Sequence, residues 1–190
     1  QILAGLARDK STAELVNVVP SDKPSDAYKA VAEQAKEFLP TYMHRWMNRA
    51  VCKRTVMTIP YNATKDSSRK YIREALLEEG IDPTKDELTQ VVNAVYNSMD
   101  AIVPGPMQVM RWIKKHVGQY IRNGATEVEW VTPSGFVVNQ RRDDIETTRM
   151  ELQLLGRTSI RLPTGKSKPS PNKHKSSTAP NYIHSFDASI

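Results

Sequence analysis

The stretch Arg49-Ala-Val-Cys-Lys-Arg-Thr-Val-Met-Thr-Ile-Pro-Tyr-Asn62 carries two cations four residues apart, ahead of a short apolar run and a proline. Residues four apart lie on the same face of an α-helix, so a helix here projects Arg49 and Lys53 side by side. Such a pair forms a clamp for a ligand with several negative charges. Each residue advances a helix by about 100°, and we expect Val56 and Met57 to continue roughly the same stripe.

The proline predicts where this helix ends. Pro60 has no backbone N–H to donate and clashes with the preceding turn, so we expect the helix that starts at Trp46 to end or kink near Ile59. Tyr61 then lies at the break, with its ring free to meet a base or a sugar. A plainer alternative stays open, because paired surface cations commonly form a solvated face and apolar residues of such a stripe more often pack than bind a ligand.

Composition and charge indicate a globular protein with an anionic partner. Hydrophobic residues make up 39% of the 190 residues and charged residues 25%, as in a folded chain. The 27 lysines and arginines against 21 acidic residues give a net charge of +6, which favours nucleic acid, although many basic soluble proteins have no such partner. The single cysteine, Cys52, excludes an internal disulfide and fits a reducing compartment. Because the chain starts with Gln1, we expect a piece of a longer protein.

Apolar periodicity predicts amphipathic helices over the first two thirds of the chain. A short buried helix opens the chain and is interrupted at residues 9–12. Ser25 or Asp26 can cap the next helix, whose apolar stripe runs from Tyr28 to Phe38. Further helices are expected over residues 69–79, ended by Gly80, and over 84–99 and 107–120, separated by a proline-glycine break at 103–106.

Strand-like runs follow Gly124. Residues 128–131 and 136–138 flank the turn sequence Thr132-Pro-Ser-Gly135 and predict a β-hairpin. Because the expected helices come first along the chain and the hairpins follow them, the expected fold class is α+β, mainly α-helical.

A second pair of strand-like arms lies at 146–155 and 157–162, around Gly156. The segment 163–180 that follows is rich in proline, serine and lysine. We expect it to be a flexible basic loop that could follow a phosphate backbone.

Three separated motifs resemble those of the single-subunit RNA polymerases of the bacteriophage and mitochondrial type. The spacing Arg49-x3-Lys53-x7-Tyr61 is similar to the Arg-x3-Lys-x7-Tyr-Gly motif that holds the incoming nucleoside triphosphate in that family, although family A DNA polymerases carry a similar helix. Residues 128–140 resemble the family's Trp-Val-Thr-Pro-x-Gly hairpin. Residues 179–189 resemble its Ala-Pro-Asn-φ-φ-His-Ser-x-Asp-x-Ser motif. The chain departs from the family next to the tyrosine, where asparagine replaces glycine but still tolerates a left-handed backbone.

The resemblance covers essentially the whole chain and implies the fingers subdomain of a right-hand polymerase with a C-terminal β-hairpin region. Residues 1–22 would be a palm fragment, and residues 23–123 the helical fingers, with the nucleotide-binding helix at about 43–61. Residues 124–184 would hold the β-hairpins with a promoter-recognition loop and the basic loop. Residues 185–190 would start the returning palm.

The implied activity is DNA-templated RNA synthesis by nucleotidyl transfer from ribonucleoside triphosphates, which we expect the complete enzyme and not this chain alone to perform. Arg49 and Lys53 would neutralise the triphosphate and stabilise charge on the leaving phosphate. Met57 would belong to the nucleotide-binding stripe. Tyr61 would stack at the template–nucleotide step and help to sense the 2′-hydroxyl, and His184 would contact the ribose or the minor-groove side.

In this family, a β-hairpin enters the major groove of the promoter, and it lies at the place of the strand-like arms 146–155 and 157–162. Arginine can read guanine and a carboxylate can read cytosine. The side chains expected to reach base edges are those of Arg149, Glu151, Arg157 and Arg161.

The implied cofactor is Mg²⁺, two ions held by carboxylates outside this chain. The expected partners are double-stranded promoter DNA, the template strand, nascent RNA and ribonucleoside triphosphates, with no membrane and a monomeric parent enzyme. The expected location is the cytoplasm of an infected bacterial host, with a mitochondrion or another organelle as the alternative. Two other functions stay open: a fragment of a family A DNA polymerase, and a non-enzymatic basic helical module that binds DNA.

Overall fold

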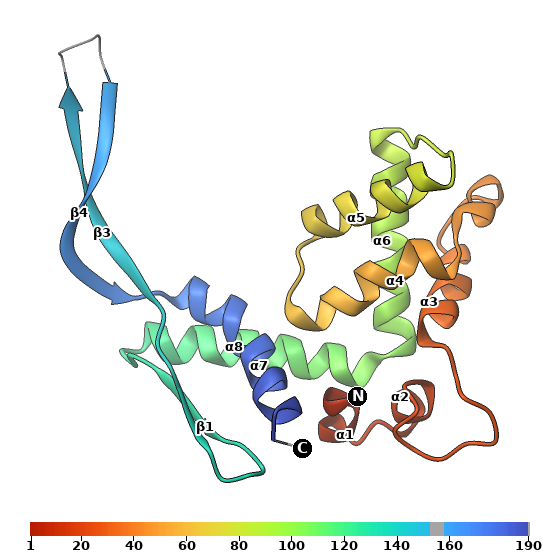
Figure 1. Cartoon of the computed structure of the whole chain (residues 1–190), viewed down its shortest axis with the longest axis horizontal. Helices are drawn as coiled ribbons and strands as arrows, with labels where there is room; N and C mark the ends of the chain where they lie inside the picture. The colour runs from red at the N-terminus through yellow and green to blue at the C-terminus, as the bar shows by residue number, and fades with distance from the viewer. Residues whose placement is uncertain (153–157, 190) are drawn as a thin grey trace. The chain divides into compact units, whose positions relative to one another are not determined.

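Two residues, Arg8 and Asp9, separate the two short helices that open the chain. In a computed structural model, which describes residues 1–152 and 158–189 (Figure 1), α1 (Ile2–Ala7) is followed directly by α2 (Lys10–Leu15). The Asp9 side chain caps α2 by accepting a hydrogen bond from the backbone N–H of Thr12 at 3.1 Å. The expected interruption of one helix is therefore the start of a second one.

Backbone contacts divide the chain into two units, residues 1–112 and 113–190. The boundary falls inside α7 (Pro104–Arg122), and each unit is described by itself. The division into palm and fingers segments stays a prediction.

The core of the first unit is formed by four helices, which Figure 1 shows grouped together: α3 (Ala27–Lys36), α4 (Arg49–Thr58), α5 (Lys65–Glu78) and α6 (Lys85–Ile102). Each helix begins after a side chain that accepts a hydrogen bond from its first turn, namely Asp26, Asn48, Thr64 and Thr84. Val31, Ile72 and Val95 are at most 1% exposed at the centre of this core. Phe38 is 45% exposed, because α3 ends at Lys36, so its expected place in the apolar stripe is wrong.

The second unit contains the predicted hairpin. β1 (Val128–Val131) and β2 (Val137–Gln140) pair antiparallel, with Trp130 opposite Val138. Gly135 in the turn has a φ of 82°, a conformation that a residue with a Cβ rarely adopts.

A second antiparallel pair follows, formed by β3 (Asp143–Leu152) and β4 (Thr158–Pro169), and it projects as a long twisted ribbon in Figure 1. The last helix is α8 (Pro171–Asp187), and Ser170 caps it. The stretch 163–180 is therefore the end of a strand and the start of a helix, and the expectation of a loop is wrong. A capping serine followed by a proline in the first helical turn is a helix-start signal that outweighs the loop-like composition.

The described residues thus form a mainly helical chain with two antiparallel hairpins, which confirms the α+β class. Its assignment to a fingers subdomain stays a prediction. None of the helices in these residues combines the length and the apolar character that crossing a membrane requires.

Candidate functional site

The helix that carries the predicted clamp begins later than expected. Asn48 caps α4, since its side-chain oxygen accepts a hydrogen bond from the Val51 N–H at 3.0 Å. The backbone at Asn48 is extended, and Trp46 belongs to the separate 3-10 turn η1 (Thr41–Trp46). The helix expected over about 43–61 is therefore divided into pieces, because the capping asparagine stops α4 from extending toward the N-terminus.

The exposed face of α4 carries Arg49, Lys53 and Met57. Their spacing of four residues forms one stripe, as predicted. Val56 is only 8% exposed and packs in the core, so its expected place in the stripe is wrong. The reason is geometric, because Val56 lies about 100° from Met57 around the helix axis.

The helix ends where the proline predicts. α4 stops at Thr58, and a 3-10 turn, η2 (Ile59–Tyr61), leads to Asn62, whose φ of 66° is left-handed. The Asn62 N–H donates to the carbonyl of Ile59 at 2.9 Å. Tyr61 is 43% exposed at this break. Asparagine thus adopts here the backbone conformation that glycine adopts without strain.

Two side chains hold Arg49, one at its edge and one at its face. Its Nε donates to Oδ2 of Asp26 at 2.8 Å, and its guanidinium carbon lies 5.3 Å from the centre of the Tyr28 ring. Hydrogen bonds from the backbone N–H of Lys29 and from Arg49 hold the pKa of Asp26 below its ordinary value. Lys53, one turn later, makes no ion pair with any residue that the structure describes. The predicted clamp therefore combines a guanidinium held by two side chains with an ammonium group that makes no ion pair among the described residues.

The neighbouring cation on α4 has a different role. Arg54 pairs with Glu74 at 2.9 Å and lies 4.0 Å from the centre of the Tyr71 ring, both on α5. It therefore links two helices. Sequence reasoning missed the side chains that hold Arg49, because Asp26 lies 23 residues upstream and gave only the signal of a helix cap.

In the second unit, hydrogen bonds fasten α8 to the β1–β2 hairpin. Trp130 Nε1 donates to Ser185 Oγ at 2.8 Å. The Gln140 amide donates to Thr178 Oγ1 at 2.7 Å and accepts from Asn181 Nδ2 at 2.6 Å. Gln140 and Thr178 are buried, so this network is shielded from water.

Aromatic rings extend the same contact. The Tyr182 ring lies 5.8 Å from that of Trp130 and 4.4 Å from that of Phe186, measured between centres. Ile183 is buried, and the adjacent His184 is exposed. Helix α8 therefore buries one face within its unit and exposes His184 on another.

The β3–β4 ribbon has two chemically different faces. Side chains alternate between the faces of a strand, so three predicted base-reading residues share one face, namely Arg149, Glu151 and Arg161. Arg149 lies directly opposite Arg161, and all three side chains are exposed. The other face carries the opposed apolar pair Met150 and Ile160. The fourth predicted residue, Arg157, lies outside the described residues.

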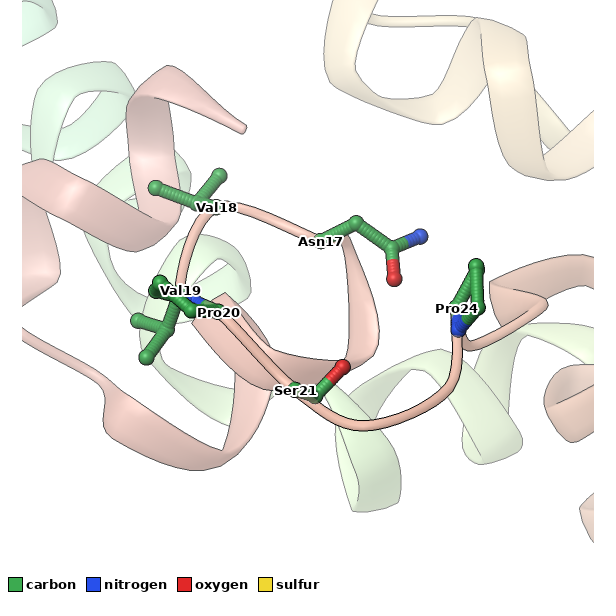
Figure 2. Close-up of a pocket in the computed structure, with 6 residues that line it drawn as sticks. All are labelled: Asn17, Val18, Val19, Pro20, Ser21 and Pro24. Carbon is green, nitrogen blue, oxygen red and sulfur yellow. The ribbon is translucent and has the colours of Figure 1, made fainter.

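An open pocket of about 340 Å³ lies in the loop between α2 and α3 (Figure 2). Its lining has no ionisable side chain and contains none of the predicted site residues: Asn17, Val18, Val19, Pro20, Ser21 and Pro24. The Asn17 amide is already bonded to both the N–H and the carbonyl of Ser25. This pocket therefore has no part in the candidate site.

The described residues do not fit a magnesium site. Across residues 1–152 and 158–189, no group of three or more His, Cys, Asp or Glu side chains is placed to hold a metal ion.

A family model described as DNA-dependent RNA polymerase matches residues 1–190. The chain belongs to this family. It is 30% identical over 204 residues to the mitochondrial DNA-directed RNA polymerase of Mus musculus and 25% identical over 247 residues to the T7 RNA polymerase of Escherichia phage T7. Each alignment covers all of this chain, but only 17% of the mouse polymerase and 28% of the phage polymerase. Membership confirms the resemblance drawn from the three motifs and decides against a family A DNA polymerase.

Proposed function

We propose that this chain is the part of a DNA-directed RNA polymerase that binds the incoming ribonucleoside triphosphate and the promoter. The observation that carries the proposal is the exposed pair Arg49 and Lys53 on one face of α4, in a chain of the DNA-dependent RNA polymerase family. Residues 23–123 would form helical fingers, between palm segments at 1–22 and, after the hairpin region, at 185–190.

The clamp acts through charge on the triphosphate. Arg49 offers N–H donors in a planar fork that matches two phosphate oxygens, and Lys53 places a compact charge one helical turn away. Negative charge moves toward the leaving pyrophosphate in the transition state, so both cations stabilise that state more than the bound substrate. Met57 completes the exposed stripe and packs against the nucleotide.

Two further side chains act on the base and the sugar. Tyr61 stacks at the template–nucleotide step and helps to sense the 2′-hydroxyl, a role supported by its exposed ring at the end of the helix. His184 contacts the ribose or the minor-groove side, supported by its exposure on α8. The proposal includes two Mg²⁺ ions bound by carboxylates outside this chain.

The β3–β4 ribbon reads the promoter. The major groove admits a two-stranded ribbon, and arginine there pairs with guanine while a carboxylate accepts from cytosine. The support is the shared exposed face of Arg149, Glu151 and Arg161. Because the relatives come from a phage and from mitochondria, we propose a monomeric enzyme in the cytoplasm of an infected bacterium, with an organelle as the alternative.

The test is Lys53→Ala in the complete polymerase, with Lys70→Ala, an exposed lysine on α5, as the matched control. Hydrogen bonds to charged groups contribute about 1.5–3 kcal/mol, so kcat/KM for ribonucleotide incorporation should fall about 10- to 100-fold. The control should leave it unchanged. Equal incorporation by the Lys53→Ala enzyme and the unmodified enzyme would rule out the clamp.

A further inference from the structure

Asp26 uses its two carboxylate oxygens for two separate purposes. Oδ1 accepts hydrogen bonds from the backbone N–H groups of Tyr28 and Lys29, at 3.0 and 3.1 Å, and so caps α3. Oδ2 accepts from Nε of Arg49 at 2.8 Å. One residue therefore connects the start of α3 to the first residue of α4.

The cap also places the ring that supports Arg49. Tyr28 follows Asp26 by two residues, and its ring centre lies 5.3 Å from the guanidinium carbon. A carboxylate at the Nε edge and a ring at the face leave the terminal amino groups of Arg49 for a ligand. Within the described part of the chain, no other residue pairs with this guanidinium.

We infer that Asp26 is a positioning residue that sets the Arg49 guanidinium for the triphosphate before the nucleotide binds. The inference rests on the proposed function of the clamp. A long arginine side chain loses rotamer freedom when it is fixed on a phosphate, and holding it in advance reduces that loss. The positioning is specific to one arm of the clamp, because Asp26 forms its ion pair with Arg49, and no hydrogen bond or ion pair joins it to Lys53 within the described residues.

The charge of Asp26 acts in the opposite direction. A carboxylate near a bound triphosphate repels it, so charge alone predicts that removing Asp26 tightens nucleotide binding. Both side chains are substantially exposed, at 52% for Arg49 and 39% for Asp26, and solvent screens that repulsion. We therefore expect the positioning effect to outweigh the repulsion, so that removing Asp26 weakens nucleotide binding.

The test uses Asp26→Asn in the complete polymerase. Asparagine caps a helix as well as aspartate does, but its single carbonyl oxygen cannot serve both the α3 cap and Nε of Arg49. The KM for ribonucleoside triphosphate should rise about two- to fivefold, the range expected for an exposed ion pair.

The equilibrium Kd of the nucleotide for an elongation complex with a 3′-deoxy RNA end should rise by the same factor. The midpoint of thermal unfolding should be unchanged. Asp26→Ser, which caps without reaching Arg49, should reproduce the effect.

Double mutants separate this inference from the proposed function. In an Arg49→Ala background, Asp26→Asn should not raise the KM or the Kd of the nucleotide any further, because the contact through which Asp26 acts is already gone. In a Lys53→Ala background, Asp26→Asn should raise both by the full factor. The positioning role is overturned, and the clamp left intact, if Asp26→Asn leaves the Kd unchanged or lowers it. The same holds if Asp26→Asn weakens nucleotide binding as much in the Arg49→Ala background as in the unmodified enzyme. If Arg49→Ala and Lys53→Ala themselves leave KM unchanged, the proposed function fails and the inference with it.

Discussion

The indole Nε1 of Trp130 donates a hydrogen bond to Oγ of Ser185 at 2.8 Å, across 55 residues of the chain. The same hydroxyl donates to the carbonyl of Tyr182 at 2.8 Å, so it acts as both acceptor and donor. Trp130 belongs to the hairpin motif, and Ser185 belongs to the motif that contains His184. Two motifs that are separate in the sequence therefore form one structural contact, and the hairpin orients the helix that carries His184.

Replacing Ser185 with alanine tests this contact. Ser185→Ala leaves the half-buried Trp130 N–H without its acceptor, at a cost of about 1 kcal/mol. We expect faster hydrogen exchange of the α8 backbone amides, because local opening becomes easier. Asn172→Ala, at an exposed position of the same helix, is the control and should leave exchange unchanged. Equal exchange in both variants would show that the contact does not hold α8.

Local signals in the sequence predicted the elements of the candidate site well. Pro60 marked the end of the clamp helix, and the spacing of four residues placed Arg49, Lys53 and Met57 on one exposed face. The hairpin around Gly135 was predictable for the same reason, since a turn that requires positive φ selects its residues locally.

Distant contacts explain what the sequence did not reveal. The pairing of Arg49 with Asp26 depends on how α3 packs against α4, and neither residue carries a local sign of it. The stretch 163–180 has the composition of a loop, yet residues 163–169 belong to β4, which pairs with β3, and Thr178 accepts a hydrogen bond from Gln140 of the hairpin. Tertiary pairing there overrides local composition.

The start of α7 should not tolerate a side chain at Gly105. A Cβ added there would lie 2.7 Å from both Cβ and Oδ2 of Asp9, whose carboxylate accepts the Gly105 N–H at 3.1 Å. We expect Gly105→Ala to lower the free energy of unfolding by about 1–3 kcal/mol, as overpacking does. Gly5→Ala is the matched control, because no atom lies within 4 Å of its added Cβ, and removing a helical glycine there should stabilise by about 0.5–1 kcal/mol. Urea unfolding measures the free energy of unfolding of both variants. A loss of stability in both would contradict the steric explanation.

Asp9 should make the first unit sensitive to acid. Hydrogen bonds from the hydroxyls of Thr12 and Ser11 lower the pKa of Asp9 from 3.8 to about 2. A carboxyl group whose pKa is depressed by folding stabilises the native state above its unfolded pKa, and this stabilisation is lost as the pH falls from about 4 to about 2. Asp9→Asn keeps the helix cap but does not titrate. Unfolding midpoints measured from pH 7 to pH 2 should show a difference between the two proteins that shrinks below about pH 4, and a constant difference would contradict the assignment.

Arg161 should contribute sequence preference on promoter DNA, whereas the opposite face of the ribbon should not. A bidentate arginine–guanine pair contributes about 1–3 kcal/mol of discrimination against the wrong base, so Arg161→Gln in the complete polymerase should relax promoter preference at a single base pair. Ile160→Thr is the control, since Ile160 lies on the other face and threonine retains strand propensity. Binding to a panel of promoters with single base changes, at fixed salt, measures both effects. A uniform loss of affinity across the panel would instead assign Arg161 to the phosphate backbone, and a changed preference in Ile160→Thr would reverse the assignment of the faces.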